Sequence, residues 1–220
     1  MSAGEPGRYR AGQTALLAKA AEAEPLVGHW RQRFDPSAAA GVPAHVTVLF
    51  PFLDADLVSA SVIGDLTALI AGHSPLTVRF DGCGRFPDVL YLAPDPTGPL
   101  RALTESVAAR WPEAPPYGGQ FAEVVPHLTV AHGQPSGVFD EVEAELADRL
   151  PVSATISSVS LYVSDGQRWR CHTEFPMLGA SGTTSVSASN RSIGSCARSG
   201  SPMWGQTLTA VRPSAQRFTT

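Results

Sequence analysis

The sequence predicts a single α+β domain made of two related lobes, each with a mainly antiparallel sheet flanked by helices, and with an active-site cleft between the lobes. Three observations support this fold class. Helical patterns and hairpin-like pairs of strand patterns follow one another along residues 12–178. One short strand motif occurs twice, 82 residues apart, a spacing far longer than a solenoid repeat. The length of 220 residues suffices for one sizeable core or two small lobes.

Proline, glycine and capping residues mark the elements of the first lobe. The segment TALLAKA, from Thr14, could form a strand, although its Ala, Leu and Lys content through residue 24 favours a helix. Residues 25–34 begin with proline and have helical apolar spacing, which predicts an amphipathic helix. Residues 42–52, rich in β-branched and aromatic side chains, predict a buried strand. Residues 54–72 predict a helix capped by Asp54, with Leu57 on its inner face.

The second lobe repeats this alternation and ends in a hairpin. Asp165-Gly166 is the strongest short-range hairpin signal in the chain. The expected elements are two strands within 75–93, a helix at 97–111 capped by Thr97, a Pro/Gly-rich loop at 113–120, a strand at 124–132, a helix at 139–150, and the hairpin strands 154–164 and 167–178.

The charge is distributed unevenly along the chain. Sixteen basic and 20 acidic residues give a net charge of −4, but residues 179–220 hold four arginines and no acidic residue, so residues 1–178 carry −8. The C-terminal segment is rich in Ser and Thr and has no sustained periodicity, which predicts a disordered tail. Its arginines are too sparse for a nucleic-acid-binding arm and fit a solvated tail better.

Composition also restricts the partners. An acidic domain repels long polyanions, so a small nucleotide or the end of an RNA strand is a better ligand than a long nucleic acid. No apolar run approaches the ~18 residues of a membrane span, and the N-terminal residues lack a secretory pattern, so we expect a cytoplasmic protein with no membrane partner. We also expect a monomer. Cys83, Cys171 and Cys196 have no CxxC spacing, which predicts free thiols, no metal and no cofactor.

The duplicated motif is His45-Val46-Thr47-Val48 and His127-Leu128-Thr129-Val130. Composition alone predicts about 0.015 copies of His-apolar-Thr-Val in such a chain, so the pair is a specific signal. Residues i and i+2 of a strand share a face. Each strand therefore presents an imidazole and a hydroxyl side by side, with the valines and leucine packed behind.

Two such strands across a cleft suit phosphodiester chemistry. One imidazole can deprotonate the attacking oxygen and the other can protonate the leaving oxygen, because an ordinary histidine pKa near 6.5 allows both states near neutral pH. The two threonine hydroxyls can donate to the non-bridging oxygens. No metal is required for this reaction.

These residues resemble the 2H phosphoesterase superfamily, and in particular its 2′-5′ RNA ligase and cyclic phosphodiesterase branch. The resemblance covers residues 12–178. It rests on the first motif with Leu49-Phe50-Pro51-Phe52 after it, on the segment from Arg85 to Leu92, and on the second motif after Pro126. It implies that TALLAKA is a strand.

The resemblance also implies that His45 and His127 are the acid–base pair and that Thr47 and Thr129 bind phosphate oxygens. It implies metal-independent hydrolysis of 2′,3′-cyclic phosphate, or reversible formation and cleavage of 2′-5′ linkages, at RNA termini or in small nucleotides. Which histidine is the base stays open. A binding module for RNA termini or nucleotides without turnover is the alternative, and a metal-dependent hydrolase is a third hypothesis.

Other residues are weaker candidates for the site. Tyr91 could stack a base or belong to the core. Tyr117, with Phe121, flanks the loop before the second motif and could contact substrate. On an unbroken strand, His132 and Phe50 would point to the face opposite the motif histidines. Trp169 and Arg170 are adjacent on a strand, so only one of them can face the cleft, and the sequence does not show which. Arg85 is a further candidate phosphate contact.

Overall fold

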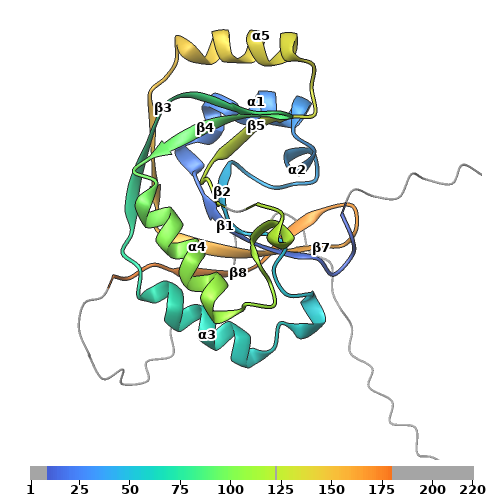
Figure 1. Cartoon of the computed structure of the whole chain (residues 1–220), viewed down its shortest axis with the longest axis vertical. Helices are drawn as coiled ribbons and strands as arrows, with labels where there is room; N and C mark the ends of the chain where they lie inside the picture. Colours follow the sequence, from blue (N-terminus) through green and yellow to red (C-terminus); the bar gives the residue numbers. More distant parts are fainter. Residues whose placement is uncertain (1–8, 122, 180–220) are drawn as a thin grey trace, which may run out of the picture.

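The computed structural model describes residues 9–121 and 123–179 and contains two four-stranded antiparallel sheets (Figure 1). The first sheet has the spatial order β2 (His45–Leu49), β1 (Thr14–Lys19), β7 (Ser158–Ser164) and β8 (Trp169–Pro176). The second has the order β5 (Leu128–His132), β4 (Val89–Asp95), β3 (Leu76–Phe86) and β6 (Val152–Ile156). The predicted fold class is confirmed. Strands β2 and β5, hereafter the motif strands, are both edge strands.

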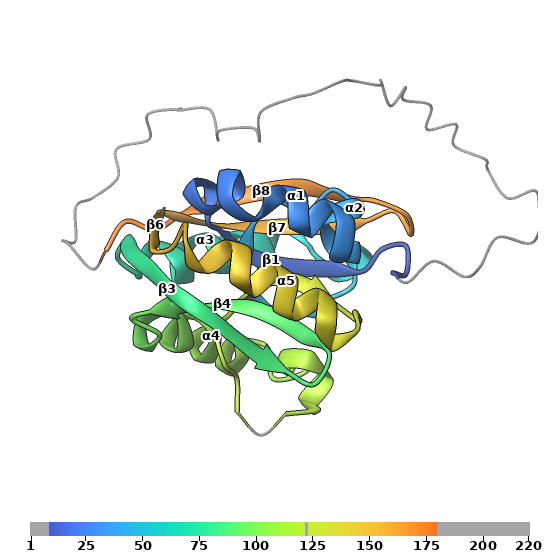
Figure 2. The ribbon, with the colours of Figure 1, turned by 90° about the horizontal axis from the view of Figure 1, so that it is seen from above.

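The helices and strands of the first lobe occur in the same order in the second lobe. The α-helices are α1 (Glu24–Phe34), α2 (Pro36–Ala39), α3 (Ala60–Ala71), α4 (Gly98–Arg110) and α5 (Ser136–Ala147), and the 3-10 turns are η1 (Ala21–Ala23), η2 (Ala55–Leu57) and η3 (Pro116–Gly119). Apart from α2 and the turns, the series β1-α1-β2-α3 is repeated as β4-α4-β5-α5. Figure 2 shows β1, β7 and β8 in one layer and β3 and β4 in another.

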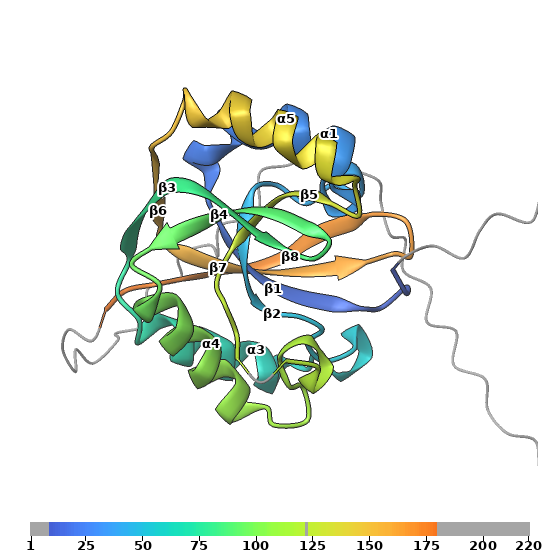
Figure 3. The ribbon, with the colours of Figure 1, turned by 45° about the horizontal axis from the view of Figure 1, so that its top comes forward.

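The two lobes exchange helix contacts. Helix α1 of the first lobe contacts β5 of the second, helix α4 of the second contacts β2 of the first, and the motif strands contact each other. In Figures 1 and 3, α1 and α5 lie at one end of the molecule and α3 and α4 at the other. Buried Val46 and Val48 from β2 share one core cluster with Leu128 and Val130 from β5. This shared core holds the two motif strands together.

Residues 14–19 form a strand, so the helix predicted by propensity for this segment is wrong and the strand implied by the family resemblance is confirmed. β1 lies between β2 and β7, and five of its six residues are buried. A central strand position gains more from burial on both faces than the propensity difference costs. The helical preference is expressed only after the strand, in η1 and α1.

The helix expected at residues 54–72 is shorter than predicted. The turn η2 precedes α3, and the N-cap is Ser59, whose hydroxyl accepts from the Val62 N–H at 3.4 Å. Asp54 forms an ion pair with Arg10 instead of capping. Leu57 is 59% exposed, which contradicts its expected place on the inner face. The prediction assumed one continuous helix, but Leu57 lies in the separate turn η2, so it does not share the inner face of α3.

Several other expectations concern the chain termini and the cysteines. The predicted tail, residues 179–220, lies outside the described residues except for Gly179. Cys83 is a free thiol, but Cys171 is disulfide-bonded, so the free thiol expected there is wrong. The odd cysteine count had suggested no pairing. Within the described ranges, no helix is long and apolar enough to cross a membrane.

Candidate active site

The two motifs line one cavity of about 650 Å³. His45 and Thr47 come from β2, while Thr129 comes from β5 and His127 from the residue just before it. All four side chains are partly buried, whereas the intervening Val46 and Leu128 are buried in the core. The structure therefore brings together the four residues of the duplicated motif, on facing edges of two sheets.

Each motif histidine is oriented by a hydrogen bond to the backbone. Nδ1 of His45 lies 2.7 Å from the carbonyl oxygen of Pro43, and Nδ1 of His127 lies 2.8 Å from that of Val125. A carbonyl oxygen can only accept, so Nδ1 carries the proton in both rings. Nε2 of each ring is left with its lone pair for the cavity. The two sites use the same contact, two residues upstream, as the duplication requires.

Burial favours the neutral form of both imidazoles. Burial, followed by the charge of Arg31, lowers the pKa of His45 to about 4. Burial also lowers the pKa of His127 below its ordinary 6.5, opposed by the hydrogen bond to Val125. A lowered pKa in the folded state means that stability falls as the pH drops below 6.5, because the unfolded chain then binds protons that the buried rings do not. Both pKa values are therefore lowered, and the charge of Arg31 contributes to the lowering at His45.

A β-bulge occurs at the same position in both motif strands. In the pairing of β1 with β2, Leu17 is opposite Thr47 and Leu16 is opposite Leu49, so Val48 is the extra residue. In the pairing of β4 with β5, Tyr91 is opposite Thr129 and Leu90 is opposite Ala131, so Val130 is the extra residue. A bulge shifts side-chain parity by one residue.

The bulges bring Phe50 and His132 into the cavity. The parity expected from an unbroken strand, which turned both residues away from the motif histidines, is therefore wrong. Phe50 and His132 occupy equivalent positions in the two lobes, each five residues after a motif histidine. The aromatic ring in one lobe is matched by an imidazole in the other, so the cavity walls are not symmetric.

Tyr117 reaches the cavity from the loop before the second motif. It has a left-handed backbone, with φ of 52°, and its N–H donates to the Phe50 carbonyl at 2.6 Å. Burial raises its pKa above the ordinary 10, and the side chain of Thr47 beside it partly offsets this rise. The ring of Phe121 packs edge-on against it at 5.6 Å. A loop of the second lobe thus fastens onto the motif strand of the first.

Tyr91 lies one layer behind the cavity. Its ring stacks on Phe86 at 4.4 Å and packs against His127 at 5.4 Å, and Phe86 itself meets His127 edge-on at 5.2 Å. Phe86 lines the cavity, and Tyr91 is not among its lining residues. The pair supports the His127 ring from one side. Gly84 makes this possible, because a Cβ there would lie 2.5 Å from the Tyr91 ring.

Two lining residues were not predicted from the sequence, and the sequence does not fix the orientation of a third, Trp169. Asp35 and Ser37, between α1 and β2, line the cavity beside His45, and Trp169 lines it from the start of β8. The Asp-Pro-Ser sequence after a predicted helix was the available signal for the first two. Arg85, considered as a phosphate contact, instead pairs with Asp140 and Glu143 on α5.

Arg170 points to solvent, where it lies 3.6 Å from Asp165. Among residues 9–121 and 123–179, no group of three or more His, Cys, Asp and Glu side chains is placed to hold a metal ion.

The chain is similar to proteins of one family. The family model described as the 2′-5′ RNA ligase superfamily matches residues 18–168. A Bacillus pumilus protein named "Putative phosphoesterase" is 33% identical over 109 residues, which cover 48% of this chain and 61% of that protein. A Bacillus cereus protein of the same name is 29% identical over 128 residues, covering 54% and 66%. The match thus spans less than two thirds of these relatives.

Solved structures show the same fold. Escherichia coli LigT complexed with 3′-AMP superposes with a TM-score of 0.51 and 20% identity, covering 76% of this chain and 99% of LigT. A Thermus thermophilus protein superposes with a TM-score of 0.50 and 16% identity, covering 77% of this chain and all of that one.

The support of His127 by Tyr91 predicts a difference between two glycines of β3. Gly84→Ala would push the Tyr91 ring from its place and destabilise the fold by about 1–3 kcal/mol through overpacking. Gly82→Ala is the matched control, because a Cβ there meets nothing within 4 Å. Urea unfolding of both variants measures the difference. Equal midpoints for Gly84→Ala and the wild type would contradict the packing described here.

Proposed function

Because the chain belongs to the 2′-5′ RNA ligase superfamily, whose model matches residues 18–168, we propose that it is a phosphoesterase that opens 2′,3′-cyclic phosphates at RNA termini or in small nucleotides. One observation carries the proposal: two imidazoles line the same cavity with their Nδ1 atoms bonded to the backbone, which leaves both Nε2 atoms for substrate. The reaction uses one ring as base and the other as acid.

His45 is the base and His127 the acid in this proposal. His45, with a pKa of about 4, is neutral over most of the working pH range and can accept a proton at Nε2. It takes the proton of a water molecule whose oxygen forms a bond to phosphorus. The bond from phosphorus to one ribose oxygen breaks, and Nε2 of His127 supplies the proton to that oxygen. Binding of the anionic phosphate favours the protonated His127 that this step needs.

Thr47 and Thr129 are proposed to donate to the two non-bridging phosphate oxygens. Both hydroxyls stand beside the histidines on the cavity wall. Tyr117 lies beside Thr47, whose side chain lowers the Tyr117 pKa, and we propose that this contact orients the Thr47 hydroxyl toward the phosphate. Tyr117 thus acts on the substrate mainly through Thr47. Tyr91 is proposed to act through Phe86 and His127 rather than by stacking on a base.

Aromatic walls on both sides of the histidines suit a nucleoside. Phe50 and Tyr9 meet the Trp169 ring edge-on at 6.0 and 5.2 Å, and all three line the cavity, as does Phe86 opposite. Rings of this kind stack on bases without reading sequence. The 3′-AMP in the E. coli LigT complex is a nucleoside monophosphate of the type that cyclic-phosphate opening releases. The acidic charge of residues 1–178 favours such small ligands over long RNA.

Activity assays on the full chain test the proposal. We expect turnover of nucleoside 2′,3′-cyclic phosphates in the presence of EDTA, and a loss of at least ~10²-fold in kcat for His45→Ala and for His127→Ala. His172→Ala is the control, because His172 is exposed and its ring is hydrogen-bonded to the hydroxyl of the neighbouring Thr173. Chromatography coupled to mass spectrometry identifies the product.

The same assay separates the alternatives. Full activity in both motif variants would contradict the two-histidine mechanism, and activity that collapses in EDTA would select a metal-dependent hydrolase. Nucleotide binding with no product from any cyclic phosphate or 2′-5′ dinucleotide would select a binding module. Joining of a cyclic-phosphate end to a 5′-hydroxyl end would show the reverse, ligase direction.

The pKa shifts predict an acidic optimum for kcat/KM, which reports groups of the free enzyme. Activity should fall below pH 4, where the base His45 becomes protonated, and should also fall as the acid His127 loses its proton, at a pH below 6.5. Initial rates with a 2′,3′-cyclic nucleotide between pH 3.5 and 9 measure the profile. An activity that rises steadily from pH 7 to 9 would contradict the assignment.

A further inference from the structure

Arg31 is a buried charge on the inner face of α1. Its side chain is 1% exposed, and the facing carboxylate of Asp35 is 4% exposed. Nη2 of Arg31 donates to Asp35 at 2.9 Å, and Nε donates to the same oxygen at 3.2 Å. The Asp35 carboxylate also accepts from the N–H and hydroxyl of Ser37. The Arg31–Asp35 pair is desolvated and closely bonded, and Asp35 and Ser37 both line the cavity.

The guanidinium also bonds across the two lobes. Nε of Arg31 lies 3.1 Å from the carbonyl oxygen of Thr129, to which it donates. Thr129 belongs to the second motif, whereas α1 leads into the first. Arg31 therefore ties the backbone of one motif strand to the helix that precedes the other.

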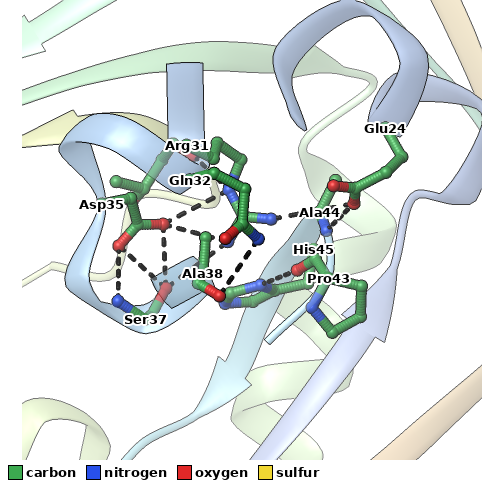
Figure 4. A network of polar contacts seen from close by, with 10 residues as sticks. Glu24, Arg31, Gln32, Asp35, Ser37, Ala38, Pro43, Ala44 and His45 are labelled. Carbon is green, nitrogen blue, oxygen red and sulfur yellow. Dashed lines mark hydrogen bonds and ion pairs between the residues drawn. The ribbon is translucent and has the colours of Figure 1, made fainter. Parts of the chain in front are cut away.

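The other side of the guanidinium faces the segment that carries His45. Nη1 of Arg31 is buried without a hydrogen-bond partner, and its nearest carboxylate oxygen is on Glu24, at 3.9 Å. Glu24 accepts from the N–H of Ala44, next to His45. Figure 4 shows Arg31 between the carboxylates of Asp35 and Glu24, with His45 close to this network.

The equivalent helix of the second lobe has no fully buried charge, because its Arg101 is 38% exposed and pairs with Glu123. The buried residues of α4 are Leu100, Leu103, Thr104 and Val107, none of which is ionisable near neutral pH. Helix α4 packs on β2 as α1 packs on β5. The duplicated scaffold is thus electrostatically asymmetric at its centre.

We propose that Arg31 is a positioning residue that fixes the second motif strand and places a buried positive charge behind His45, and thereby makes His45, not His127, the base. The inference rests on the proposed function for its catalytic meaning. A nearby cation disfavours the imidazolium form, so the charge keeps the Nε2 lone pair of His45 free. Asp35 opposes this effect, because its negative charge raises the pKa of His45.

Other ionisable groups also face His45, among them Asp88, Glu123 and His132, which line the same cavity. His127 lies across the cavity and lowers the pKa of His45 slightly when protonated. Lys19 is opposite His45 on β1, but its ammonium group is paired with Glu174 at 2.6 Å. Glu24 faces Arg31 and is itself bonded to Ala44. Arg31 and Asp35 are therefore the two groups whose removal should move the His45 titration in opposite directions.

NMR titration of the His45 imidazole in the full chain tests this sign. Arg31→Met should raise the pKa of His45 by about 1, and Asp35→Asn should lower it further. Arg31→Lys keeps the charge and should leave the pKa near its wild-type value, while losing the forked bond to Asp35 and Thr129 and lowering kcat. Arg33→Met is the matched control, since Arg33 is exposed on the same helix. The His45 signal is identified by its loss in His45→Gln.

The outcomes separate the inference from the proposed function. An unchanged His45 pKa in Arg31→Met, or shifts of the same sign in Arg31→Met and Asp35→Asn, would overturn the inference. If Arg31→Met does not fold, Asp35→Asn still tests the sign, because it should lower the pKa of His45. Opposite shifts in a protein without phosphoesterase activity would support the charge placement and reject the proposed function. Phosphoesterase activity in the wild type, with no shift of the His45 pKa in any variant, would support the proposed function and reject the charge placement.

Discussion

The hydrogen bond from Nδ1 of each motif histidine to the carbonyl oxygen two residues earlier is the constraint on which the site depends. It fixes the tautomer and the ring orientation together, because only one nitrogen can donate while the other keeps a lone pair. The bond also gives the buried Nδ1–H of each ring a hydrogen-bond acceptor. Burial therefore lowers the pKa values of His45 and His127 without leaving a buried donor unpaired. The shared core then holds the two rings on one cavity.

The duplication supplies a symmetric frame, and a few residues break its symmetry. Both motif strands carry a bulge at the valine that ends the motif, and both are packed by a helix from the other lobe. On this frame, Phe50 in one lobe corresponds to His132 in the other, and the charged Arg31 of α1 has no charged counterpart in the buried face of α4. In the proposed reaction the two rings must be in different protonation states, and an electrostatic difference between the lobes determines which ring carries the proton.

The sequence was sufficient to predict the motif pair, the α+β class and the antiparallel sheets, because strand alternation and a repeated motif are local signals. It could not show the bulges at Val48 and Val130, since one unpaired residue leaves no mark on composition and reverses the parity of all that follows. The cross-lobe bond of Arg31 and the reach of Tyr117 to Thr47 depend on tertiary packing. Thr14–Lys19 is a strand because its neighbours in the sheet outweigh its helix propensity.

The tautomers of His45 and His127 are the most direct test of this account. Long-range proton–nitrogen NMR spectra near pH 7 distinguish a protonated Nδ1 from a protonated Nε2 in each imidazole, and single His→Gln variants assign the two rings. The account predicts that Nδ1 is protonated and Nε2 is not, in both rings. A protonated Nε2 with a bare Nδ1 in either ring would contradict it, because that ring could then neither bond to its carbonyl nor present a lone pair to the cavity.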